Sequence, residues 1–118
     1  MKAKSSNELL AEYCEAAQIH GRATDAGDAR RGNRAHDRIV RLRSELMSHG
    51  EAYQQGMLAL LKHRDPHVRV WAASDILSFA PDEAVRALRE VAAQMPKAAA
   101  LNAKMTLKLW EAGEWKHV

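Results

Sequence analysis

The chain has 118 residues, of which 47% are hydrophobic and 28% are charged, enough for a single domain (1–118) that folds without disulfides or a metal. Its 18 Lys and Arg against 15 Asp and Glu give a formal net charge of +3, an excess too small to demand a nucleic-acid partner. Six glycines and three prolines exclude collagen-like and low-complexity chains, and a single cysteine excludes an internal disulfide.

The composition favours helix along the whole chain. Alanine supplies 22 residues and leucine 12, whereas Val, Ile and Thr together supply only 11. Alanine and leucine lose little conformational freedom in a helix, and no alternating β-branched run predicts a strand. We therefore expect an all-α fold of about six helices, over residues 6–24, 28–49, 52–63, 66–78, 82–94 and 97–112.

The first helix is predicted to begin after Ser5, because Ser5 with Glu8 fits a capping box. The second carries an apolar stripe that we expect to be buried: Ala35, Ile39, Leu42 and Leu46. At 100° per residue the opposite stripe is basic and consists of Arg30, Arg34, Arg38 and Arg41. Such a stripe could bind an acidic protein surface or a phosphate backbone, or it could be a solvated face partly neutralised by Asp28, Asp37 and Glu45.

The second half is punctuated by Pro66, Pro81 and Pro96, fifteen residues apart. Proline is tolerated in the first turn of a helix, so each is read as a helix start. A comparison of the chain with itself at an offset of thirty residues supports a two-helix repeat. It aligns Leu58 with Leu88, Leu61 with Val91, Pro66 with Pro96, Trp71 with Leu101, and Leu77 with Leu107.

Residues 60–73 (LLKHRDPHVRVWAA) resemble a HEAT-type repeat, in which leucines end one helix, Asp-Pro forms the turn, and Val-Arg with paired alanines opens the next. Here Asp65 would cap the second helix, Pro66 would fix its entry, and Val68 and Ala72 would face the core. The next unit keeps the proline as Pro96, but Lys97-Ala98-Ala99 replaces the His-Val-Arg that follows Pro66. Such a departure is typical of a degenerate terminal repeat. The resemblance implies a short right-handed α-α superhelix.

Arg69 and Asp75 on the same helix are predicted to be structural, as residues that tie neighbouring turns in HEAT repeats. Asp75 falls on a mostly apolar face, and a buried carboxylate needs partners, so we expect it to cap a helix or to meet an arginine.

The whole layout is also similar to a small bacterial domain family of unknown function with a HEAT-like fold. The resemblance rests on the Gly27-Asp28 turn, on Asn33 and Asp37, on the HEAT motif and on Trp110. Some relatives of that type lie beside toxin genes and are thought to act as immunity proteins.

No residue pattern predicts catalysis or a cofactor. No serine lies in a nucleophile elbow, no glycine loop could cradle a phosphate, and no second acid or nucleophile is spaced to work with Asp75. His63 and His67 have the spacing of a helical metal pair, but Asp65-Pro66 interrupts the helix between them. We therefore expect neither an enzyme nor a metal site.

Tryptophans and lysines near the end of the chain offer a second binding hypothesis. Trp71, aligned with Leu101, is expected in the core. Trp110 projects away from the stripe of Leu101, Met105 and Leu109, and lies near Lys104 and Lys108. Tryptophan beside cations is common at protein interfaces, although Trp110 could instead close the core of the last repeat.

These features predict a protein-binding module, specifically an immunity-type protein that occludes a cognate bacterial toxin through the arginine stripe and the basic last helix. The alternatives are a nucleic-acid-binding protein and a structural adaptor. Nine Lys and Arg against eight Asp and Glu over residues 51–118 disfavour nucleic acid. No signal peptide or membrane span is recognisable, so we expect a cytoplasmic protein. We also expect a monomer or a weak homodimer.

Overall fold

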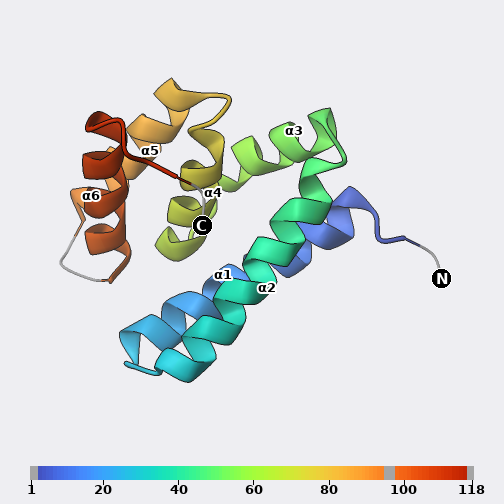
Figure 1. Ribbon diagram of the computed structural model, residues 1–118, viewed down its shortest axis with the longest axis horizontal. Helices are drawn as coiled ribbons and strands as arrows, with labels where there is room; N and C mark the ends of the chain where they lie inside the picture. The colour runs from blue at the N-terminus through green and yellow to red at the C-terminus, as the bar shows by residue number, and fades with distance from the viewer. Residues whose placement is uncertain (1–2, 95–97, 117–118) are drawn as a thin grey trace.

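A computed structural model describes residues 3–94 and 98–116, and in these residues it contains six α-helices and no strand (Figure 1). The all-α prediction is therefore confirmed. The helices are α1 (Ser6–Asp25), α2 (Ala29–Met47), α3 (Glu51–Leu60), α4 (Pro66–Ile76), α5 (Pro81–Ala92) and α6 (Ala98–Glu111).

Side chains at the helix starts explain most of these boundaries. Ser5 and Glu8 form the predicted capping box of α1, with the Glu8 amide donating to Ser5 Oγ at 3.1 Å. Asp65 caps α4, because its Oδ1 accepts from the His67 amide at 2.9 Å, and Pro66 and Pro81 are the first residues of their helices, as predicted. The predicted start at Pro96 lies outside the described residues.

The helices pack in an order that follows the chain. The hairpin of α1 and α2 forms one long limb, α3 leads from it to α4, and α4, α5 and α6 stack in succession (Figure 1). α4 lies at the centre, in contact with α1, α3, α5 and α6. This arrangement is that of a short helical superhelix.

The core runs along α4 and the inner faces of its neighbours. In α4, Val68, Ala72 and Ile76 are fully buried, and small residues here let the neighbouring helices approach closely. The predicted apolar stripe of α2, Ala35 to Leu46, is also buried.

The apolar stripe that contains Leu101 and Met105 is not the buried face of the last helix. Leu101 and Met105 are 65% and 61% exposed, while α6 buries Ala99, Ala100, Ala103 and Thr106 instead. The reason is that α6 presents its small residues to α4 and α5, where close packing favours short side chains over long ones. Trp71, aligned with Leu101 and expected in the core, is only half-buried.

No helix within the described ranges has the length and apolar character needed to cross a membrane.

Candidate partner-binding surfaces

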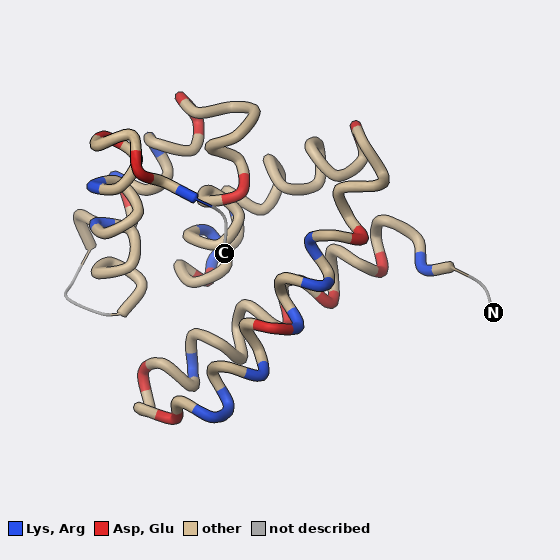
Figure 2. The backbone as a smooth tube through the Cα atoms, viewed as in Figure 1, with Lys and Arg blue, Asp and Glu red and all other residues tan. Residues whose placement is uncertain are grey.

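The four arginines of the predicted stripe lie on α2, but they do not form one equivalent set. Arg30, Arg34 and Arg41 are exposed, as is the neighbouring Arg31, and basic positions recur along this helix in Figure 2. Arg38 is half-buried against α1. The four exposed arginines, Arg30, Arg31, Arg34 and Arg41, are called the arginine face below.

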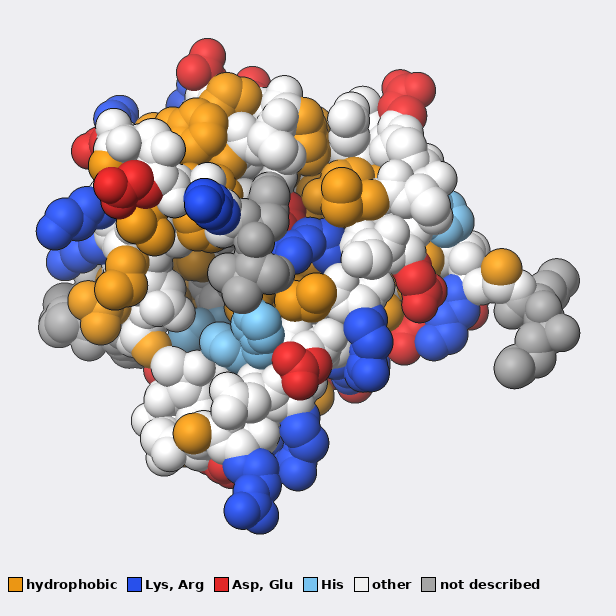
Figure 3. Space-filling view, viewed as in Figure 1, with side chains coloured by type: hydrophobic (Ala, Val, Ile, Leu, Met, Phe, Trp, Pro, Cys, Tyr) orange, Lys and Arg blue, Asp and Glu red, His pale blue; other side chains and the backbone are white. Residues whose placement is uncertain are grey.

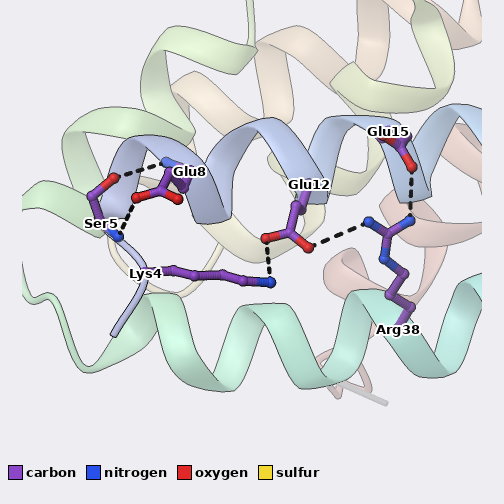
Figure 4. Close-up of polar contacts among 6 residues, drawn as sticks. All are labelled: Lys4, Ser5, Glu8, Glu12, Glu15 and Arg38. Atoms are coloured by element: carbon purple, nitrogen blue, oxygen red, sulfur yellow. Dashed lines mark hydrogen bonds and ion pairs between the residues drawn. The ribbon is translucent and has the colours of Figure 1, made fainter. Parts of the chain in front are cut away.

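Arg38 belongs to an ion-pair ladder between α1 and α2 (Figure 4). Its Nη1 lies 3.1 Å from Glu15 Oε1 and its Nη2 lies 3.5 Å from Glu12 Oε1. Glu12 is also 2.7 Å from Lys4 Nζ, and this contact with Lys4 is the main cause that lowers the pKa of Glu12. Arg38 is therefore engaged within the chain, across the hairpin of α1 and α2.

No residue of the arginine face makes an ion pair with any other residue in the described ranges. Of the three carboxylates expected to neutralise them, Asp28 accepts at Oδ1 from the Arg31 amide at the start of α2, and Asp37 lies 3.5 Å from His36 Nδ1. Glu45 is exposed and makes no ion pair with these arginines among the described residues. Four guanidinium groups on one exposed helix face thus keep their charge available for an external partner.

Asp75 is buried at the junction of three helices. It is 1% exposed, its Oδ1 accepts from Arg43 Nη1 at 3.1 Å, and its Oδ2 accepts from the Tyr13 hydroxyl at 2.8 Å. Burial first, and Asp75 next, raise the pKa of Tyr13 well above its ordinary 10.0, so the phenol stays protonated and donates. The arginine that Asp75 was predicted to need is Arg43, on α2. Arg69, its predicted companion, has its Nε buried without a hydrogen-bond partner among the described residues.

A cleft of about 280 Å³ lies between the hairpin and the helices α4 and α6. Histidine side chains gather in this hollow (Figure 3). Trp71 forms its wall, with His20 at 5.2 Å in an edge-on arrangement and His36 at 5.8 Å, measured between ring centroids. Met105 and Leu109 of α6 face them, and Trp115 reaches in from the segment after α6.

The cleft is lined mainly by apolar and neutral groups. Burial, followed by the nearby His36 and His67, lowers the pKa of His20, so this imidazole is neutral near pH 7. Asp75 lies at the floor with Arg43, where the two charges offset each other. In the part of the chain that is described, no three His, Cys, Asp or Glu side chains are grouped as metal ligands.

The predicted binding residues of α6 do not form one site. Lys104 and Lys108 are exposed, whereas Trp110 is half-buried and lines a separate open groove with Arg86 and Arg89 of α5. The helices α2 and α6 are not in contact, so these residues do not join the arginine face either.

Sequence reasoning missed the cleft. Its walls come from α1, α2, α4 and α6, and the positions of His20, His36 and Trp71 follow no recognisable spacing. The one available signal was the pair of long apolar residues in α6, Leu101 and Met105, which share one stripe of that helix with Leu109.

Comparisons with known proteins agree with this architecture. Residues 7–111 match the family described as "Domain of unknown function (DUF2019)". The chain is similar to the protein RPA1889 from Rhodopseudomonas palustris CGA009, known from a crystal structure, with a TM-score of 0.84 and 23% identity over 99% of this chain and 100% of that one. At this identity the likeness concerns the fold alone. No curated protein matches the chain.

Proposed function

The chain belongs to the DUF2019 family of domains of unknown function, and we propose that it is a non-enzymatic protein-binding module that docks onto an acidic surface of its partner. The observation that carries the proposal is the arginine face, whose four side chains are exposed and have no ion pair among the described residues. Arginine is the side chain best suited to binding carboxylates in pairs, because its planar fork offers two parallel donors.

The scaffold supports this use of the arginine face. The ladder of Lys4, Glu12, Arg38 and Glu15 and the buried contact of Arg43 with Asp75 fix α2 against α1 and α4. A partner therefore meets arginines on a rigid helix and orders only their side chains on binding, which reduces the entropic cost of association.

Within this function, the specific proposal is an immunity-type protein of the cytoplasm, with a HEAT-like repeat as its scaffold, that binds a cognate bacterial toxin. The resemblance of residues 60–73 to a HEAT repeat supports it, as does the resemblance of the layout to a family of unknown function in which some members are thought to act as immunity proteins. Neutralisation by occlusion requires only a rigid complementary surface over the toxin's active site or substrate path, which stacked helices supply. No catalytic group of the chain is needed.

Affinity purification from the source cell, followed by identification of the retained protein, tests the proposal. We expect one partner with an acidic surface to be retained by the wild-type chain and lost by the variant Arg34→Glu/Arg41→Glu. If that partner is a toxin, co-expression should restore growth with the wild-type chain and fail with the variant. A retained partner without toxicity would instead identify a structural adaptor and remove the immunity proposal.

A duplex-binding measurement distinguishes the protein-binding proposal from the nucleic-acid-binding alternative. The proposal predicts no specific complex with duplex DNA at about 50 mM salt, because the remainder of the chain carries nearly balanced charge. A complex at that salt concentration that dissociates steeply as salt rises, and that requires Arg34 and Arg41, would overturn the protein-binding proposal.

A further inference from the structure

Two long apolar side chains form an exposed ridge on α6. Leu101 and Met105 lie one helical turn apart and are 65% and 61% exposed, and Met47 on α2 is the only other large apolar residue in the described ranges with comparable exposure. An isolated exposed leucine needs no explanation, but a contiguous pair beside a cleft indicates a contact surface.

The ridge continues into the cleft. Met105 belongs to both, because it is exposed on one side and lines the cleft together with Trp71 and Leu109 on the other. The cleft volume of about 280 Å³ is at or below the lower end of pockets that hold small-molecule ligands, and its wall is apolar. Such a hollow suits one large side chain carried on a longer segment that rests on the ridge.

The charges around the ridge define the polar part of that segment. Lys104 and Lys108 follow Leu101 and Met105 by three residues each, so they flank the ridge on the helix surface. Both are exposed, and neither forms an ion pair with another residue in the parts of the chain described. The carboxylate within the cleft, Asp75, is fully buried and lies 3.1 Å from Arg43, so it does not offset the charge of the two lysines.

We propose that the α6 ridge and the adjoining cleft dock an amphipathic helical segment of a partner protein, which inserts one aromatic or long aliphatic side chain between Trp71 and Met105 and places acidic residues beside Lys104 and Lys108. A helix laid in a groove recognises its target by apolar anchors on one face, and the flanking charges set its orientation. This inference rests on the proposed function in requiring a protein partner, and it adds a surface separate from the arginine face.

Selection from a random peptide library displayed on phage tests the inference without a known partner. We expect the enriched peptides to carry apolar residues at helical spacing, with one aromatic residue and flanking Asp or Glu. Met105→Asp should weaken binding of these peptides by at least about tenfold, and Lys104→Glu/Lys108→Glu by about tenfold. Both sites are exposed, so these variants should fold, which circular dichroism checks.

The matched control is Arg34→Glu/Arg41→Glu, which makes the same charge change on α2 and should leave peptide binding unaltered. Retained peptide binding by this variant, with loss of the cellular partner, would separate the two surfaces. The inference is overturned if no peptide is enriched, if the enriched peptides are basic, or if Met105→Asp binds them normally. It is also overturned if the wild-type chain dimerises through this ridge and Met105→Asp is monomeric, because the ridge would then be occupied by a second copy.

Discussion

At the scale of single residues, Asp75 decides how three helices meet. Its carboxylate is fully buried, and it accepts from Arg43 on α2 and from Tyr13 on α1. A buried charge is tolerated only when it is paired and hydrogen-bonded. The Asp75 carboxylate can therefore be buried only because Arg43 and Tyr13 both donate to it. These two hydrogen bonds fix the position of the hairpin against α4, because they require a defined direction and distance that an apolar contact does not.

Removing either donor should destabilise the fold by an amount that depends on what is left behind. Arg43→Ala leaves a buried carboxylate without its counter-charge and should lower the free energy of unfolding by about 3 kcal/mol. Tyr13→Phe removes one hydrogen bond and should cost about 1–3 kcal/mol. Urea unfolding measures both, with the exposed Arg41→Ala as the control that should change stability by less than about 0.5 kcal/mol. An Arg43→Ala variant as stable as this control would show that the ion pair of Arg43 with Asp75 does not stabilise the fold.

The two tyrosines predict a specific loss of stability at alkaline pH. Burial raises the pKa of Tyr53 to about 12 and that of Tyr13 well above 10.0, whereas in the unfolded chain both return to ordinary values. When the pKa of a group is higher in the folded chain than in the unfolded chain, the group stabilises the fold fully at pH values below the unfolded pKa. This contribution is lost progressively as the pH rises towards the folded pKa. The free energy of unfolding should therefore fall as the pH rises from about 10 towards 12, and Tyr53→Phe should reduce the slope.

Near-UV absorbance of tyrosinate provides the direct check. Both phenols should remain protonated in the folded chain through the range near pH 10 in which an exposed tyrosine ionises. Tyrosinate absorbance that rises there while far-UV circular dichroism still reports a folded chain would contradict this reading of their burial.

At the scale of elements, α1 crosses α4 closely because Gly21 has no side chain. A Cβ atom at Gly21 would overlap the imidazole ring of His67, including the ring's attachment to its own Cβ, so a rotation of the ring cannot relieve the clash. His67 is also held at the start of α4, where its Nε2 lies 3.3 Å from Asp25 Oδ2. The glycine therefore sets the distance between the two helices.

Gly21→Ala should destabilise the chain although alanine is the better helix former. We expect a loss of about 1–3 kcal/mol from the forced separation of α1 and α4. Gly32→Ala on α2 is the matched control, because a Cβ there would lie 3.8 Å from the Cβ of Ala23, an ordinary contact. It should gain about 0.5–1 kcal/mol from helix propensity alone. Thermal unfolding of both variants tests the argument, and a stabilised Gly21→Ala would show that α1 and α4 can move apart freely.

Helix boundaries could be predicted from local chemistry, but helix faces could not always be. Ser5, Asp65 and Pro81 act within their own turns, so their roles can be inferred without tertiary structure. The inner face of α6 depends on how closely α4 and α5 approach it. Alanine spacing rather than leucine spacing determines that face, so the alignment of Leu101 with Trp71 does not reveal which side of α6 is buried.

The arginines show the same division. Periodicity predicted the stripe on α2, but it could not separate Arg38 from Arg34 and Arg41, because the carboxylates that engage Arg38 lie on α1, 23 and 26 residues away in the sequence. Nor could spacing show that His20, His36 and Trp71 meet, since the cleft exists only once four helices have packed.

At the scale of the whole molecule, the proposed surfaces lie on different parts of the scaffold. The arginine face belongs to the hairpin, while the ridge and cleft lie where α6 faces the hairpin, so one partner could engage both or two partners could engage one each (Figure 1). Both surfaces present exposed basic side chains, although the net charge of the chain is only +3, and on the hairpin Asp28, Glu12 and Glu15 are engaged in a helix cap and in internal ion pairs. The shared requirement is an acidic partner.

The association rate of the chain with its purified cellular partner tests this claim most directly. Electrostatic complementarity acts mainly on association, so Arg34→Glu/Arg41→Glu should lower the association rate constant by about tenfold or more and weaken its dependence on salt, with a smaller change in dissociation. Lys62→Glu/Arg64→Glu, which makes an equal charge change at exposed positions near the start of α4, is the control and should alter the rate much less. An association rate that is the same for the wild-type chain and Arg34→Glu/Arg41→Glu would contradict the arginine face as the docking surface.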